Sequence, residues 1–128
     1  MTSTPNQLLA VAESIFIGSK TECMHRAVIS RAYYSTFHAC KEYHVKLPRP
    51  GSVGTASGMH NQLISQLATP DPKLSIDAKL SSIALGKLLR SLCAQRVKSD
   101  YRILETVTQD ETKRAIETAR TIFSNIPA

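Results

Sequence analysis

Residues 21–45 read TECMHRAVISRAYYSTFHACKEYHV, and this stretch decides the class of fold. Its apolar side chains recur three and four positions apart, at Val28, Ile29, Tyr33, Phe37 and Cys40. That spacing is the period of an amphipathic α-helix and differs from the alternation of a β-strand. No proline or glycine interrupts the segment, so we expect one continuous helix from about Thr21 to Val45.

Helical periodicity continues on both sides of this segment. Long helices are predicted over about 5–18, 75–104 and from Thr108, where Thr108 and Glu111 have capping-box spacing. A short helix is predicted over about 59–67, and the proline- and glycine-rich residues 47–58 predict a flexible loop. A chain of 128 residues supports one core. We therefore predict a single all-α domain, an up-down bundle of four to five helices, with 75–104 packed on 21–45.

The composition excludes several classes of protein. The apolar stretch from Leu8 to Ile17 contains Glu13 and is shorter than the roughly 20 residues that cross a bilayer. The N-terminus lacks the pattern of a secretory signal, so we expect a cytoplasmic protein that does not enter the membrane. Three cysteines without a CxxC pair argue against a disulfide scaffold or a zinc ribbon, and Cys93 is expected in the core.

Positive charge is concentrated in the middle of the chain. Residues 20–102 hold 13 of the 16 basic side chains and only 5 of the 10 acidic ones. Such a surface attracts nucleic acid, but it also suits an acidic partner protein or plain solvent. The best candidates for a nucleic-acid-binding surface lie around the 75–104 helix: Lys87, Arg90, Lys98 and Arg102.

A polar stripe on the 21–45 helix offers a candidate catalytic site. Arg31 and His38 are seven residues apart, which places them on one face about 10.5 Å from each other, with Tyr34 and Ser35 between them. Arg31 can bind a phosphate, and an imidazole titrates near neutral pH, so His38 can serve as a general acid or base. The alternative is a structural ion pair for Arg31 and an ordinary polar role for His38.

Arg96 and Asp100 are four residues apart on the 75–104 helix, where Arg96 continues the apolar row. We expect Arg96 to form an ion pair with Asp100 or with a residue of the 21–45 helix. Cys40 and His44 could bind a metal ion together with His60 or His25. These residues lack, however, the paired spacing of a zinc site. No metal or other cofactor is predicted.

Two stretches resemble a known family. The run RAVISRAYYSTFHAC at 26–40 resembles the S-R-A-Y-Y-x-x-F-H-A helix of HEPN-domain proteins, which are small helical domains of prokaryotic toxin and phage-defence systems. The run LRSLCAQRVKSDY at 89–101 is similar to the family's L-x-x-x-R-x-x-A-D-Y segment. The resemblance implies a helical bundle, a homodimer, and a nucleotidyltransferase or antitoxin partner.

Many HEPN proteins are metal-independent ribonucleases whose R-x(4–6)-H motif converges across the dimer. Here Tyr101 stands where that histidine would follow Arg96. The resemblance therefore leaves two functions open. In an endoribonuclease acting on tRNA or mRNA, Arg31 or Arg96 would hold the phosphate and His38 would move the 2′-hydroxyl proton. In a non-catalytic module, Arg31, Arg96 and Asp100 would form a buried network, with Tyr34 and Tyr101 in support.

Overall fold

The computed structural model describes residues 3–127, and every element of regular structure in that range is an α-helix. The helices are α1 (Pro5–Ile17), α2 (Glu22–Val45), α3 (Met59–Ala68), α4 (Ile76–Tyr101) and α5 (Gln109–Asn125). The all-α prediction is confirmed, and each predicted helix is present. No helix within residues 3–127 combines the length and the apolar character needed to cross a membrane.

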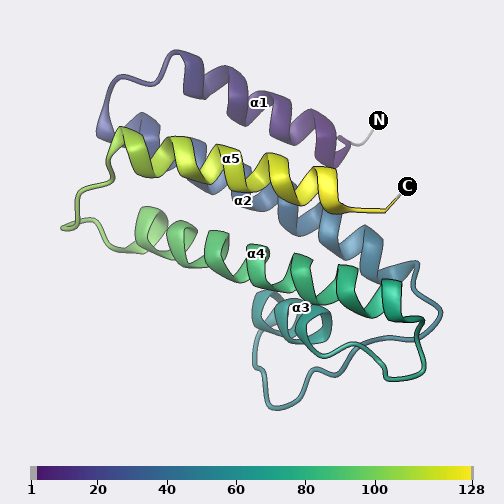
Figure 1. The fold of residues 1–128 in the computed structure, drawn as a ribbon. Coiled ribbons are helices and arrows are strands. Elements are labelled where there is room, and N and C mark those ends of the chain that lie inside the picture. Colours follow the sequence, from purple (N-terminus) through teal and green to yellow (C-terminus); the bar gives the residue numbers. More distant parts are fainter. Residues whose placement is uncertain (1–2, 128) are drawn as a thin grey trace.

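The four long helices alternate in direction along the chain, as in an up-down bundle (Figure 1). α2 contacts each of the other four helices, which makes it the central helix of the fold. The predicted packing of α4 against α2 is confirmed. The short helix α3 packs mainly against α4, below the bundle in the view of Figure 1.

One contiguous core joins the helices. Buried apolar side chains from all five of them pack together, including Leu85, Leu89 and Leu92 of the predicted apolar face of α4. Cys93, which was expected in the core, is only partly buried at its edge, whereas Cys40 is fully buried. The core fixes the register of α2 against α4, and that register places the site described below.

The end of α4 differs from the prediction by three residues. The helix stops at Tyr101, and Leu104, which was expected on its apolar face, is fully exposed. The cause is Arg26 on α2, whose guanidinium donates hydrogen bonds to carbonyl oxygens of the last turn and of the following loop: Lys98, Ser99, Arg102, Ile103 and Glu105. Glu22 holds Arg26 in place through Nε at 2.7 Å.

The loop between α2 and α3 is tied to its neighbours. The Gly51 amide donates to His44 Nε2 (3.1 Å), and the Ser52 amide donates to the Thr69 carbonyl (3.0 Å). Gly51 is required because a Cβ there would collide with the Gln66 carbonyl of α3. These contacts tie α3 to the end of α2 through the loop and so help to determine where His60, at the start of α3, is placed.

The predicted capping box at the start of α5 is half formed. The Thr108 hydroxyl accepts the Glu111 amide hydrogen at 3.1 Å, as the spacing predicts. The Glu111 carboxylate does not return to the cap, however, because both its oxygens accept hydrogen bonds from Lys98 Nζ at 3.0 Å. The lysine thereby links α4 to α5.

Candidate functional site

The outer face of α2 carries the polar stripe that the sequence predicts. Arg31 and His38 are exposed, and Tyr34 between them is 37% exposed. Ser35 does not belong to the stripe: it is fully buried, and its hydroxyl donates to the Ala32 carbonyl at 2.7 Å. The stripe therefore consists of Arg31, Tyr34 and His38. These residues are three and four positions apart and share one face of α2.

Arg31 is not part of a buried network. Among residues 3–127 it makes no ion pair and no side-chain hydrogen bond, and it lines a shallow apolar pocket with Leu8, Val11 and Tyr34. Its guanidinium is consequently available to bind an anion from solvent.

Arg96, by contrast, is buried in a cage of aromatic rings. Only 8% of the residue is exposed, and its guanidinium carbon lies 5.3–5.5 Å from the ring centroids of Tyr33, Tyr34 and Tyr101. Such distances are those of cation–π contacts. We refer to Arg96 and these three rings, together with Asp100, as the arginine cage.

Hydrogen bonds complete the arginine cage. Arg96 Nε donates to Asp100 Oδ2 at 3.0 Å, which confirms the predicted ion pair. Nη2 donates to the hydroxyls of Tyr34 (3.0 Å) and Tyr101 (3.2 Å). Burial alone would lower the pKa of Arg96, but the two phenols and Asp100 outweigh it and raise that pKa. The guanidinium is thus a permanent positive charge behind the face of α2.

His60 is a candidate site residue that sequence reasoning missed. It was weighed only as a metal ligand, yet it lies at the start of α3 against the second half of α2. Its Nδ1 is 2.7 Å from the Tyr33 hydroxyl, and its ring centroid is 4.6 Å from that of Phe37. No hydrogen bond engages its Nε2 within residues 3–127.

Both imidazoles contact one aromatic ring. The ring centroid of His38 is 5.4 Å from that of the same Phe37. The pKa of His60 is lowered by burial first, then by the nearby Arg96 and His38. The lowered pKa favours the neutral form of His60, which shares its surroundings with a second imidazole and a guanidinium. We call His38, His60 and Arg31 the imidazole site.

The sequence contained only a weak signal for His60. The residue stands just after the 47–58 loop, at the first turn of a short helix, and nothing in its spacing to α2 reveals which side of α2 it meets. That position depends on how Gly51 and Ser52 anchor the loop. A tertiary contact of this kind cannot be found from periodicity.

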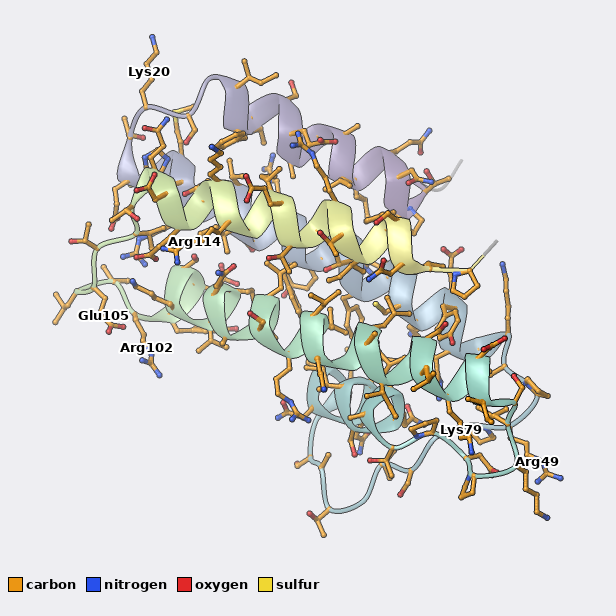
Figure 2. The ribbon with its side chains drawn as sticks, viewed as in Figure 1. Lys20, Arg49, Lys79, Arg102, Glu105 and Arg114 are labelled. Carbon is orange, nitrogen blue, oxygen red and sulfur yellow. The ribbon has the colours of Figure 1, made fainter. Side chains whose placement is uncertain are left out.

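The four predicted nucleic-acid-binding residues of α4 do not form one free surface. Lys98 is paired with Glu111, and Arg102 lies 3.6 Å from Glu105 at the loop between α4 and α5 (Figure 2). Lys87 and Arg90 are exposed, and neither forms an ion pair in the part of the chain that the structure describes. Of these four residues, only Lys87 and Arg90 in the middle of α4 are thus available to bind a ligand.

The residues considered as metal ligands do not come together in one site. Cys40 is buried, His44 Nε2 accepts the Gly51 amide, and His25 Nδ1 is 2.5 Å from the Ser19 hydroxyl. Over residues 3–127, His, Cys, Asp and Glu side chains form no group of three or more that could hold a metal ion.

Comparison with models of protein families, with curated proteins and with solved structures finds no match for the chain.

Proposed function

We propose that the chain is an HEPN-like protein that acts on RNA as a metal-independent endoribonuclease, with the imidazole site as its catalytic centre. The observation that carries the proposal is that His38 and His60 both contact the ring of Phe37. Arg31, exposed and without an ion pair among the described residues, lies about two turns before His38 on the same face of α2. Phosphodiester cleavage by a 2′-hydroxyl needs one group that accepts a proton, one that donates a proton and one that stabilises the phosphate. The imidazole site supplies all three.

The proposed base is Nε2 of His60. Burial, and then the neighbouring Cys93, raise the pKa of Tyr33, so its hydroxyl stays protonated. In the tautomer that the proposal requires, His60 Nδ1–H donates to the Tyr33 hydroxyl oxygen across the 2.7 Å contact. The neutral imidazole then presents Nε2 as a base.

The reaction follows from these assignments. His60 Nε2 takes the proton of the 2′-hydroxyl, and the 2′-oxygen attacks the adjacent phosphorus. The bond from phosphorus to the 5′-oxygen breaks, and protonated His38 gives its proton to that oxygen. Arg31 binds the non-bridging oxygens, on which negative charge develops. The products are a 2′,3′-cyclic phosphate and a free 5′-hydroxyl, and every proton transfer is assigned to a side chain.

Incubation of the purified protein with total RNA and tRNA in EDTA tests this function. The proposal expects cleavage that EDTA does not inhibit, and no cleavage of a DNA of the same sequence, because deoxyribose lacks the 2′-hydroxyl. Intact RNA at protein concentrations that saturate binding would reject the proposal. Cleavage of the DNA would reject the mechanism.

The pH dependence of cleavage is a separate prediction. A general base works only when it is neutral, so the rate should fall as the pH drops through the pKa of His60. Because that pKa is lowered, the acidic limb should have its midpoint below the ordinary imidazole value of about 6.5. A pH–rate profile of kcat/KM measures it. A midpoint at or above 6.5 would assign the base to another group.

A second candidate function is a non-catalytic module that binds a nucleotidyltransferase, an antitoxin or a second copy of the chain. The observation that favours it is the closed arginine cage, in which Arg96 is occupied by Asp100, Tyr34 and Tyr101. In this alternative Tyr101 completes a structural network in place of a catalytic histidine. A protein that remains inactive on RNA but co-purifies with such a partner would support it.

A further inference from the structure

A groove lies between α3 and α4. Its walls come from the loop before α3, from one face of α3 and from the middle of α4, and its volume is about 660 Å³. That volume is within the range of about 300–1,000 Å³ typical of ligand pockets. We call it the α3–α4 groove.

The lining of the α3–α4 groove is neutral except for one cation. Thr55, Ser57, Asn61 and Ser65 contribute hydroxyl and amide groups, and Arg90 contributes the charge. No carboxylate lines it. Asn61 Nδ2 donates to the Ser57 carbonyl, while its Oδ1 makes no hydrogen bond within residues 3–127. Such groups match the base edges of single-stranded RNA, and the guanidinium matches a phosphate.

The groove is connected to the imidazole site through its walls. Asn61 follows His60 on α3, and Cys93 on the α4 wall neighbours Tyr33, whose hydroxyl contacts His60. The groove and the proposed base are therefore neighbours on α3.

Positive charge continues along the α4 wall. Lys87 is three residues before Arg90, so the two exposed side chains share one face of the helix. Two adjacent free cations favour a ligand with repeated phosphates over a single anion.

We propose that the α3–α4 groove holds the single-stranded RNA that flanks the cleaved linkage, with Arg90 on a phosphate and the hydroxyl and amide groups of the wall on the bases. This inference rests on the proposed function, since it places the substrate of that same site. Of the four predicted nucleic-acid-binding residues, it gives Arg90 a specific role as the phosphate ligand of the groove and assigns Lys98 and Arg102 to structural pairs.

Binding of a 2′-O-methyl RNA oligonucleotide, which cannot be cleaved by the proposed mechanism, tests the groove. Fluorescence anisotropy is measured over a range of salt concentrations for the wild type, Arg90→Gln and Arg49→Gln. Arg49 is the matched control because it is an exposed arginine on the loop after α2 (Figure 2). Arg90→Gln should weaken binding and reduce the slope of log K against log salt by about 0.7, the value for one lost phosphate contact on a single strand. Arg49→Gln should leave both unchanged.

Two tryptophan variants test whether the RNA binds inside the groove or to a positively charged surface elsewhere. Ala94 lines the groove on α4, so Ala94→Trp should fill it and weaken binding. Ala10→Trp, at an exposed position of α1, should not. Circular dichroism shows whether each variant is folded.

The outcomes distinguish the groove from the catalytic proposal. Three results would overturn the proposed RNA binding in the groove, even if the wild type cleaves RNA. They are no binding by the wild type, equal binding by the wild type and Arg90→Gln, and equal losses of binding in Arg90→Gln and Arg49→Gln. Selective loss of binding in Arg90→Gln and Ala94→Trp would support it, even if the protein cleaves nothing.

Discussion

Replacement of Arg96 by methionine should lower the free energy of unfolding by about 2–4 kcal/mol. Methionine keeps the aliphatic stem, so the loss comes from the charge and its hydrogen bonds. Asp100, with 24% of its side chain exposed, would lose its partner, and the Tyr34 and Tyr101 hydroxyls would lose a donor. Removing one member of a buried pair leaves the other uncompensated, which costs more than the pair itself contributes. Urea unfolding, monitored by circular dichroism, measures the change.

Arg102→Met is the matched control. It removes the same group from the same helix end, but Arg102 and its partner Glu105 are 63% and 50% exposed at their side chains. Exposed pairs contribute little, so the change should stay within about 0.5 kcal/mol. Similar effects of the two substitutions would show that the arginine cage does not stabilise the fold and would remove the structural role assigned to Arg96.

Substitution of either histidine of the imidazole site should reduce kcat for RNA cleavage by about 10²–10⁴-fold, the usual contribution of a general acid or base. Glutamine is the suitable replacement for His60 and His38, because it keeps a polar side chain of similar length without a group that titrates. His60→Gln should also abolish the acidic limb of the pH–rate profile, which a purely structural role would leave in place.

Lys41→Gln is the control for this pair. Lys41 is exposed on α2, three residues after His38, so it tests the loss of a polar group and a charge on the same face. The kcat of Lys41→Gln for RNA cleavage should stay within a few-fold of the wild-type value. Full activity in His60→Gln would mean that the Tyr33–His60 hydrogen bond serves the packing of α3 alone.

The fold could be predicted because its causes are local. The apolar period of residues 21–45 and 75–104 and the breakers at 47–58 determine the helices, and one core buries the apolar faces of all five. The end of α4 could not be predicted. It depends on Arg26, more than 70 residues away in the sequence, which binds the terminal carbonyls and leaves Leu104 in solvent.

The candidate site was predicted in part for the same reason. Arg31, Tyr34 and His38 share a helix face, and Arg96 with Asp100 is an i, i+4 pair, so spacing alone places them. His60 joins the site through a tertiary contact that depends on the loop anchored at Gly51. Arg31 is exposed and Arg96 is buried because of how α4 packs on α2. The periodicity of the sequence does not show this difference.

The most direct test of the imidazole site uses an oligonucleotide made of DNA except for one ribonucleotide, placed at the linkage that the wild type cuts fastest in natural RNA. In EDTA, the wild-type protein should cut only on the 3′ side of that ribonucleotide and leave a 2′,3′-cyclic phosphate. His60→Gln, confirmed as folded, should leave the oligonucleotide intact over the same time. Cleavage at a deoxyribonucleotide, a product without the cyclic phosphate, or equal cleavage by His60→Gln would contradict the assignment.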